Sequence, residues 1–434
     1  MSETDTHPGA EMHALVRRLF PICRSLTGPG TRETLDILGE HLPGLTRHRI
    51  ESGARVFDWT VPPEWTIRSA VLTGPDGQVV ADMNRHNLHV VGYSEPVDVT
   101  LSLDELQPHL HSLPDQPEAI PYITSYYSRR WGFCLTQAQR DALKPGMYHA
   151  RIDADLAPGH LDYADLVIPG ESAEEVFLST YVCHPSMANN ELSGPAVATW
   201  LAKWVAEAPR RYTYRFVFIP ETIGSLVYLS RHLDHLKSQV VAGFNLSCVG
   251  DDRTFSFMPS RRGDSLADRA ARVVLGHRAP DHIRYSFLHR GSDERQYCAP
   301  GADLPVASVM RSKYGEYPEY HTSLDDLDLV TPQGLGGSFE MLKACLQAIE
   351  ANAVWKTTVI GEPQLGKRGL YPTLSVPNGA RRLRTMMHVL AYADGTRDLI
   401  DMAGTIEADV AEVAELAALL AEHGLLERQP DPVE

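Results

Sequence analysis

Polar residues with metal-binding side chains follow several apolar segments that are typical of buried strands. His184 follows EVFLSTYVC, Glu221 follows YRFVFIP, and His321 lies in YGEYPEYHTSLDDLD after LPVASVMRS. In an open α/β sheet, ligands bind in the crevice beyond the carboxyl ends of the strands. Two histidines and a carboxylate at such an edge form a ligand set used by hydrolytic zinc. We therefore predict a metal site made by His184, Glu221 and His321.

Each of these residues also has a purely structural explanation. A single histidine at a strand end is often a hydrogen-bonded structural residue. Glu221, which follows Pro220, can cap a helix that begins at Thr222, because a negative charge is favourable at a helix N-terminus. Three such positions at one edge of a sheet favour the metal site over three unrelated structural roles.

The segment from 151 to 355 has the pattern of the sheet that these residues require. Its apolar runs EVFLSTYVCH, YRFVFIPE, VVAGFNLSCVG and LPVASVMRS alternate with the helical runs GPAVATWLAKWVAEA and SLVYLSRHLDHL, and a long helical run lies within PQGLGGSFEMLKACLQAIEANAV. Near-continuous apolar strands that alternate with amphipathic helices are typical of a parallel sheet covered on both faces. We predict an α/β fold with a mainly parallel, doubly wound sheet.

Two other regions of the chain have different patterns. Residues 56–150 contain short alternating runs broken by D-G, P-P and S-E-P, which predict a small β-rich module. Residues 370–434 contain three short helical runs in an order that resembles a winged helix-turn-helix. We therefore predict a core formed by 1–55 and 151–360, an inserted lid domain at 56–150, and a winged-helix-like domain at 361–434.

The aromatic stretch AIPYITSYYSRRWGF at the end of the β-rich module would suit a lid that faces a substrate. We name Tyr126 in this stretch as a candidate substrate contact. Arg311 and Tyr314 are further candidates, because a guanidinium binds carboxylates well. Surface ion pairing is the structural alternative for Arg311, and edge packing is the alternative for the aromatic stretch.

The charge of the chain disfavours some classes of binding partner. The chain of 434 residues has a formal net charge of −16, which disfavours nucleic acid and anionic membrane surfaces. The last helical run carries no Lys or Arg, so we expect a packing or oligomerisation module, with a homo-oligomer as one outcome, and no DNA reader. The acidic residues of this run and the turn before it are Glu407, Asp409, Glu412, Glu415 and Glu422.

No targeting or cross-linking pattern is visible. The first residues, MSETDTHPGAEM, lack the basic and apolar regions of a secretory signal, and no stretch reaches the roughly 18 apolar residues of a membrane span. We expect a cytoplasmic protein without a membrane partner. The six cysteines are scattered without a C-x-x-C pair, which argues against a disulfide framework and a thiolate zinc site.

Several longer motifs resemble a bacterial family first catalogued as domains of unknown function. The motifs are VFDWTVPPEW, AIPYITSYY, WGFC, CHPSMANNELSG, PETIGS, SRRGDSLADR, GSDERQY and YGEYPEYHTSLDDLD, and they span essentially the whole chain. The resemblance implies a zinc-aminopeptidase core, an inserted lid domain and a C-terminal winged helix. It also implies kinship with di-zinc exopeptidases and glutaminyl cyclases, and a place among genes for surface-polysaccharide or natural-product biosynthesis.

The resemblance implies roles for individual residues. His184 and His321 match the first and last histidine ligands, and Tyr320 matches a phenol that stabilises a tetrahedral oxyanion. Glu221 matches the Glu-Glu position of such enzymes and would act as a metal ligand or as the general base. Asp293 matches an aspartate that orients the site.

The chain departs from that pattern at two acidic positions. Asn190 stands where the scaffold has an aspartate that bridges two metals, and Ser247 stands where it has a further aspartate. A neutral amide does not bridge two cations well, although Glu191 could turn into the vacancy. We therefore predict one zinc ion at most, with His184, Asn190, Glu221 and His321 as its candidate ligands, or a site that binds no metal.

These features predict a metal-dependent, aminopeptidase-like amide hydrolase that acts on a peptide or an aminoacylated intermediate. Zinc would activate water, and Glu221 or the spare carboxylate Glu294 would move the proton. An acidic rim with Glu316 and Glu319 would suit a substrate with a free amine. Two alternatives remain: an amide-forming or acyl-transfer enzyme on the same scaffold, and a non-catalytic binding protein.

Overall fold

The computed structural model describes residues 8–371 and 377–430, and a large sheet forms its centre. The sheet has eight strands in the order β1-β10-β12-β11-β13-β16-β14-β15. Every residue of the central strand β11 is buried, as expected for a strand that is covered on both faces. The strands are β1 (Thr46–Glu51), β10 (His160–Ile168), β11 (Glu175–Tyr181), β12 (Thr213–Ile219), β13 (Val240–Asn245), β14 (Ser256–Met258), β15 (Ile283–Arg284) and β16 (Val306–Met310).

The predicted mainly parallel sheet is a mixed sheet with a parallel centre. β12, β11, β13 and β16 pair in parallel, which confirms the α/β pattern of the sequence. β1 and β10 extend one side of this centre by antiparallel pairing, and β14 pairs antiparallel with β16 on the other side. The antiparallel strands escaped the sequence pattern because several of them are short or half exposed.

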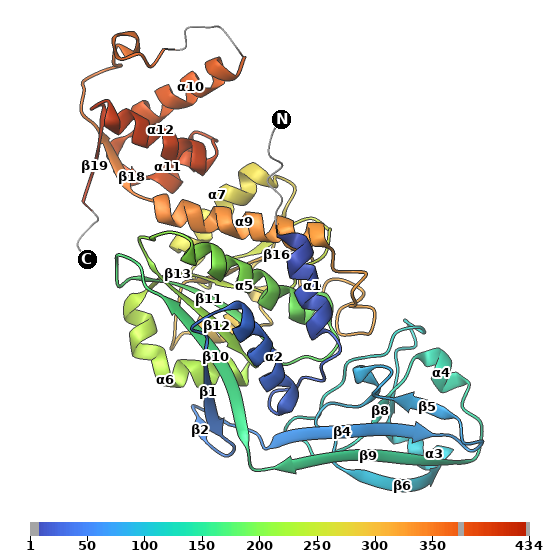
Figure 1. The fold of residues 1–434 in the computed structure, drawn as a ribbon. Coiled ribbons are helices and arrows are strands. Elements are labelled where there is room, and N and C mark those ends of the chain that lie inside the picture. Colours follow the sequence, from blue (N-terminus) through green and yellow to red (C-terminus); the bar gives the residue numbers. More distant parts are fainter. Residues whose placement is uncertain (1–7, 372–376, 431–434) are drawn as a thin grey trace.

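Helices cover both faces of the sheet (Figure 1). One face carries α1 (Gly9–Leu19), α2 (Pro29–His41), α5 (Ser193–Ala206), α7 (Leu266–Arg278) and α9 (Pro332–Ala351), whose apolar residues share a single core cluster. The other face carries α6 (Ile223–Gln239) and the short α8 (Glu294–Tyr297), whose buried residues belong to a second cluster. The sheet is therefore doubly wound, as the sequence predicts.

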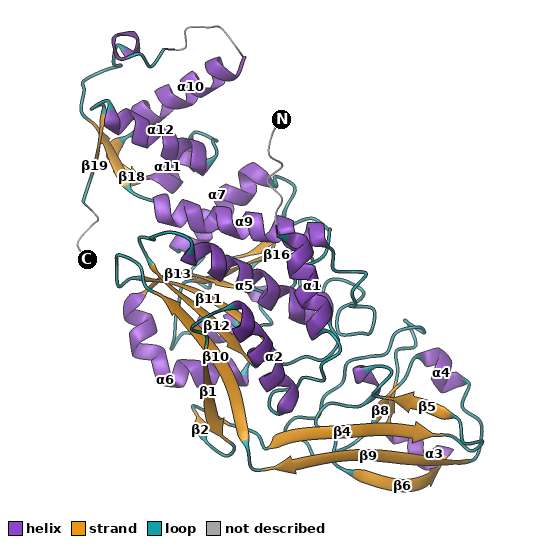
Figure 2. Cartoon of the chain, in the orientation of Figure 1, coloured by secondary structure: helices purple, strands orange, loops and turns teal. Residues whose placement is uncertain are grey.

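The inserted region builds its own four-stranded antiparallel sheet, in the order β5-β4-β9-β6, which projects away from the core (Figure 2). The predicted boundary at residue 150 falls inside β9, which continues into the core strand β10 after a short turn. The regular elements of the region and its approach are β2 (Arg55–Val56), β3 (Trp59–Thr60), β4 (Glu64–Thr73), β5 (Val79–Asp82), β6 (Val97–Ser102), α3 (Leu103–Leu106), β7 (Leu110–His111), β8 (Phe133–Cys134), α4 (Gln137–Asp141) and β9 (Met147–Ala157).

One loop of the insert is fixed to the core by backbone hydrogen bonds. The Tyr122 N–H donates to the His321 carbonyl at 2.8 Å, and the Ser323 N–H donates to the Ile120 carbonyl at 2.9 Å. The Ser323 hydroxyl also accepts from the Ile120 N–H at 2.9 Å. These bonds form a short two-stranded contact, so this part of the insert is a wall of the core and not a detached flap.

The C-terminal region has the predicted helices and a small sheet in the order β18-β17-β19. α12 packs against α9 of the core and against α10, and Arg381 on α10 pairs with Glu412 on α12 at 2.7 Å. This placement is consistent with the packing role expected from the acidic third helix. The elements are β17 (Val354–Thr357), α10 (Pro377–Tyr392), β18 (Asp394–Asp398), α11 (Leu399–Thr405), α12 (Val410–Glu422) and β19 (Leu426–Arg428).

Some segments named in the sequence analysis lie outside the described residues. The polar start of the chain, residues 1–7, and residues 372–376 and 431–434 of the predicted winged-helix region lie outside the described residues. Within the described part of the chain, no helix combines the length and the apolar character that crossing a bilayer requires.

The close approach of α5 to the sheet gives a test of the fold. A Cβ atom added at Gly194 would clash with the backbone oxygen of Leu246 and with Thr180 Oγ1. We expect Gly194→Ala to lower the free energy of unfolding by about 1–3 kcal/mol, the usual cost of overpacking. The matched control is Gly276→Ala in α7, where a Cβ would meet no atom within 4 Å.

Because alanine is the better helix former, Gly276→Ala should raise the free energy of unfolding by about 0.5–1 kcal/mol. Urea denaturation followed by circular dichroism measures both changes. Equal stability of the two variants would contradict this account of how α5 is packed.

Candidate functional site

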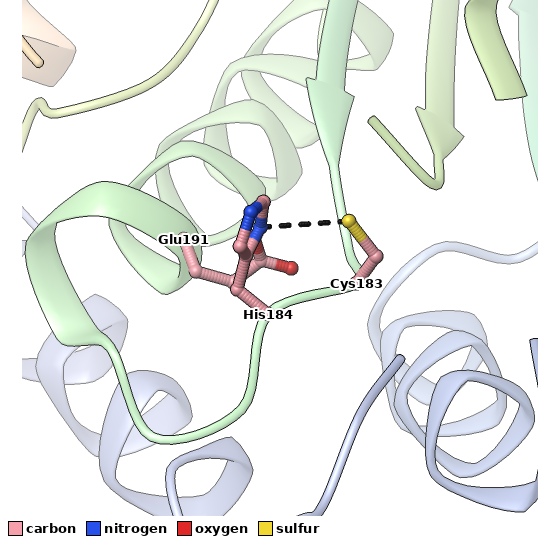
Figure 3. Close-up of side chains that lie close together, drawn as sticks. All are labelled: Cys183, His184 and Glu191. Carbon is pink, nitrogen blue, oxygen red and sulfur yellow. Dashed lines mark hydrogen bonds and ion pairs between the residues drawn. The ribbon is translucent and has the colours of Figure 1, made fainter. Parts of the chain in front are cut away.

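His184 lies just beyond the carboxyl end of β11, and its two ring nitrogens face different carboxylates. Nδ1 lies 2.6 Å from Glu191 Oε2, and Nε2 lies 3.6 Å from Glu221 Oε2. Figure 3 shows the ring beside Glu191 and Cys183. A carboxylate at one nitrogen of a histidine fixes the ring and leaves the other nitrogen to bind a metal or substrate. Glu191 therefore orients His184 so that Nε2 points toward Glu221.

Burial and the neighbouring groups act in opposite directions on His184. Burial lowers the pKa of His184, but Cys183 and the Glu191 carboxylate together reverse the effect and raise the pKa well above its usual range. The Cys183 thiol lies 3.4 Å from Nδ1, and burial raises the pKa of this thiol to about 12. Cys183 is therefore a neutral neighbour at physiological pH. Its sulfur accepts the Glu221 N–H at 3.2 Å.

Glu191 reaches His184 because it lies in a π-helical turn, Ala188–Leu192, that precedes α5. Asp325 holds this turn: its carboxylate accepts the N–H groups of Asn189 at 2.5 Å and Asn190 at 2.9 Å, and the Tyr317 hydroxyl at 2.9 Å. Burial raises the pKa of Asp325 to about 6, and these donors limit the rise. π-Helical turns are rare and are frequent at functional sites.

A strained turn presents Glu221. Thr222 has φ of 65° and ψ of −72°, and the Ile223 N–H donates to the Glu221 carbonyl at 2.8 Å, which makes a γ-turn. This conformation is costly for a residue with a side chain. Asp293 helps to hold it, because its Oδ1 accepts the Thr222 N–H at 2.7 Å and the Ser225 hydroxyl at 2.8 Å. Glu221 is thus fixed at the start of α6.

His321 is held between aromatic rings. Its ring stacks on Tyr320 with centroids 3.9 Å apart, and it lies 5.1 Å from Tyr122 and 5.5 Å from His184. Its backbone is left-handed, with φ of 55°. Burial, with the positive charge of His184, lowers the pKa of His321 to about 3. The neutral imidazole is the form that binds metals.

The buried carboxylates and histidines of the site suit the binding of a cation. Burial raises the pKa of Glu221, and burial together with the charge of Glu221 raises the pKa of Asp293 to about 8. Asp293 Oδ2 and Glu191 Oε1 are buried and have no hydrogen-bond partner among the described residues. A cluster of buried carboxylates and histidines with unused lone pairs is the environment that a divalent cation stabilises.

A second grouping of candidate ligands shares one of these atoms. Cys183, His184 and Glu191 each offer a ligand atom, and these atoms lie within 4.8 Å of one another. Among the described residues, these three therefore form a possible metal-binding group when distance is the one criterion. Both Cys183 and Glu191 approach the same ring nitrogen, Nδ1. Cys183 and Glu191 therefore occupy the Nδ1 side of the ring, and Nε2, on the side of Glu221 and His321, is the nitrogen left open to a metal or a substrate.

The site opens into a cavity of about 400 Å³. Its walls combine the three predicted ligands with aromatic residues that come largely from the insert and its approach. Tyr126 is among them, and its hydroxyl contacts that of Tyr122 at 2.8 Å. The lining residues are Leu26, Trp59, Tyr122, Thr124, Tyr126, Tyr127, His184, Glu221, Thr222, Ile223, Arg295 and His321.

Asn190 lies behind this cavity in a neutral network. Its Nδ2 donates to the Tyr181 hydroxyl at 2.7 Å, and that hydroxyl lies 2.6 Å from Ser247 Oγ. Asn190 Oδ1 is buried and has no partner among the described residues. An amide at position 190 and a hydroxyl at position 247, joined through the Tyr181 phenol, stand where the family resemblance implies two carboxylates. Glu191 does not fill the vacancy, because it is bonded to His184.

Glu294 and Tyr314 do not reach the cavity. Glu294 Oε1 accepts the N–H groups of Gly291 and Ser292 at 2.8 and 3.0 Å and the Tyr314 hydroxyl at 2.7 Å. Its Oε2 accepts from Asn245 Nδ2 at 3.1 Å. Because these donors occupy both oxygens, Glu294 supports its loop and is no longer our candidate for the general base. Tyr314 is no longer a candidate substrate contact.

Arg311 and the expected acidic rim also lie elsewhere. The Arg311 guanidinium stacks on Phe255 at 3.8 Å and donates to Ser338 Oγ and to backbone carbonyls, so packing occupies it. Glu319 pairs with Arg253 at 2.8 Å, and Glu316 is exposed beside Lys313. None of these side chains lines the cavity.

Several residues of the site carry no sequence signal of their function. Asp325 is one of three aspartates in SLDDLD, and nothing in the letters separates it from its neighbours. Arg24 is buried and donates from Nε to the His184 carbonyl at 3.0 Å, although it comes from the loop after α1. Arg295 lies two residues after Asp293 in the motif GSDERQY. This proximity to a candidate site residue is the one feature of the sequence that could have pointed to a role for Arg295.

Comparison with known proteins identifies the family of the chain. Residues 13–352 match the family described as a domain of unknown function, DUF4910, and residues 353–428 match a winged helix-turn-helix family. A Clostridium acetobutylicum protein described as a "Putative polysaccharide biosynthesis protein with aminopeptidase-like domain" is 43% identical over 403 residues, which cover 92% of each chain.

Solved structures show the same fold. The crystal structure of a putative peptidase from Clostridium acetobutylicum has a TM-score of 0.91 and 41% identity, and the match covers 97% of this chain and 96% of that one. A zinc aminopeptidase from Bacillus subtilis has a TM-score of 0.58 at 12% identity, covering 80% and 95%, which shows fold similarity alone. The chain therefore belongs to the DUF4910 family, with an aminopeptidase-like α/β core followed by a winged helix-turn-helix.

Proposed function

We propose that the chain is a metal-assisted amide hydrolase that uses one zinc ion held by His184, Glu221 and His321. The observation that carries this proposal is the meeting of these three side chains at the cavity. His184 Nε2 lies 3.6 Å from Glu221 Oε2, and the two imidazole rings lie 5.5 Å apart. Two histidines and one glutamate are a known ligand set of catalytic zinc. The aminopeptidase-like fold of the family supports the assignment.

A zinc ion held by His184, Glu221 and His321 would supply an activated water, with a pKa of about 7, and would polarise the amide carbonyl. The chain's own residues supply the rest. Glu191 keeps His184 Nε2 directed at the cavity. Tyr320 stacks on His321 with ring centroids 3.9 Å apart, and its phenol is the donor that we propose for a developing oxyanion, although Tyr320 is not among the residues that line the cavity.

The substrate that we propose is a small molecule or a short peptide, because the cavity holds about 400 Å³. The description of the Clostridium relative as a polysaccharide biosynthesis protein supports a role in building a product and not in general protein breakdown. An amide of a biosynthetic intermediate meets both conditions. The acidic charge of the chain supports a site that does not act on nucleic acid.

A second candidate function is amide formation or acyl transfer in the same cavity. The neutral network of Asn190, Tyr181 and Ser247 favours it, because a site without carboxylates at these positions differs from a two-metal hydrolase. Measuring condensation of an amine with an activated acyl donor, alongside hydrolysis of the corresponding amide, separates the two candidates. Condensation faster than hydrolysis in the same buffer would favour this second function.

Replacement of Glu221 tests the proposed ligand. Glu221→Gln keeps the shape of the side chain but removes its charge, so we expect zinc affinity and amide hydrolysis to fall at least about 10-fold. Zinc competition with a chelating dye and hydrolysis of a panel of chromogenic amides measure the two effects. Glu316→Gln removes an exposed acid outside the cavity and should change both quantities less than twofold. Unchanged zinc affinity in Glu221→Gln would contradict the assignment.

Restoring an acidic side chain at position 190 tests why one metal is expected. Asn190→Asp supplies a carboxylate with two oxygens, and such a group can bridge two cations. We expect the zinc content after reconstitution to rise above that of the wild-type chain. Asn84→Asp, which adds the same charge at an exposed position of the insert, should leave it unchanged. Equal zinc content in all three proteins would show that Asn190 does not limit metal binding.

A further inference from the structure

Arg295 lines the cavity, and the proposed hydrolysis does not use it. Its side chain is exposed and comes from α8, on the same wall as Glu221. The guanidinium donates from Nη2 to Thr222 Oγ1 at 2.5 Å. Among the described residues, no carboxylate lies within 4 Å of it. Most of the five N–H donors of an arginine therefore remain available at the cavity.

Hydrogen bonds with neighbouring turns hold Arg295 in position. Asp293 ends the turn before α8, and its carboxylate accepts the N–H of Thr222, whose side chain receives Arg295. The Arg295 N–H also donates to the Ser292 carbonyl at 3.2 Å. The guanidinium is thus attached to the same rigid turn that presents Glu221. A side chain already held in place loses less conformational entropy when it binds a ligand.

Two exposed aromatic rings belong to the same cavity. Trp59 and Tyr127 are 40% and 51% exposed, and their rings meet edge to face with centroids 5.8 Å apart. The Tyr127 hydroxyl donates to the Thr60 carbonyl at 2.9 Å, which anchors this ring. Two large apolar rings left open at a cavity mouth form a platform for a flat or apolar group of a ligand.

The charges of the cavity oppose recognition of a free amine. The one carboxylate on its wall is Glu221, which the proposed function uses to bind zinc. An ammonium group would therefore have no carboxylate of its own, and Arg295 would repel it. A carboxylate would instead find a guanidinium that can form two parallel hydrogen bonds. The Arg295 charge acts on Glu221 from a distance and limits the rise that burial causes in the pKa of that carboxyl, but no ion pair with a described residue occupies the guanidinium, so its hydrogen-bond donors stay open to a ligand.

We propose that the substrate is an amide that carries a free carboxylate beside the scissile bond, as in an N-acyl amino acid. This inference rests on the proposed function. Arg295 binds the carboxylate, and Trp59 and Tyr127 contact the acyl group. One water is consumed: the amide C–N bond breaks, the acyl carbon gains the hydroxyl, and the nitrogen gains the proton. The products are a carboxylic acid and an amino acid.

Equilibrium binding tests this selectivity apart from turnover. Isothermal titration of the full-length chain without added zinc, which does not turn the probes over, would use three related compounds: N-benzoylglycine with a carboxylate, its neutral carboxamide, and glycine anilide with an ammonium group. We expect N-benzoylglycine to bind at least about 10-fold more tightly than the other two, in keeping with the value of a charged hydrogen bond. Equal affinities, or tightest binding of glycine anilide, would overturn the proposal.

Two variants test whether Arg295 causes the preference for a carboxylate. Arg295→Gln should remove the preference for N-benzoylglycine over the carboxamide, whereas Arg290→Gln, an exposed arginine in the same segment that does not line the cavity, should retain it. In turnover, Arg295→Gln should raise KM for the carboxylate substrate and leave kcat within about twofold, as for lost uniform binding. A preference that survives in Arg295→Gln would refute the role of this residue.

The same measurements separate this inference from the function on which it rests. Hydrolysis of both benzoyl amides without a binding preference would refute the carboxylate site and leave the hydrolase intact. A fall in kcat for both amides in Arg295→Gln would also refute it, because the arginine would then act through Glu221. Arginine-dependent binding of N-benzoylglycine without any zinc-dependent hydrolysis would support the carboxylate site and refute the hydrolase.

Discussion

The site depends on the buried carboxylate of Asp325. It joins two segments that are distant in sequence, because it lies in the loop that carries His321 and accepts the backbone N–H groups of Asn189 and Asn190. Those hydrogen bonds hold the π-helical turn from which Glu191 reaches His184. A charge without exposure to solvent is tolerated there because its donors replace water. This contact holds the loop that carries His321 against the turn that carries Glu191.

A second buried aspartate holds another turn of the site by accepting a backbone N–H. Asp293 is also fully buried, and it holds the γ-turn at Thr222 that presents Glu221 and receives Arg295. Strain at Thr222 and the left-handed backbone of His321 are offset by these fixed contacts. Two acidic residues that never face the substrate thus set the positions of the groups that do. The insert completes the cavity with aromatic rings.

The sequence predicts which candidate ligands come together better than it predicts the residues that hold them. His184, Glu221 and His321 meet at one cavity because strand ends follow from apolar runs, and the parallel centre of the sheet places those ends together. The roles of Glu294 and Arg311 could not be predicted, since hydrogen bonds with backbone groups decide them. Glu191 was expected near the missing bridge, but its link to His184 depends on a π-helical turn that the letters do not indicate.

The central claim is that one zinc ion binds where His184, Glu221 and His321 meet. The most direct measurement is zinc per chain by mass spectrometry of the metal, after reconstitution and removal of loose ions, in wild-type protein and in His321→Ala. The account predicts about one zinc per chain in the wild type, in line with three protein ligands, and a large loss in the variant. A wild-type chain that holds no zinc, or two, or a variant that retains its zinc, would contradict it.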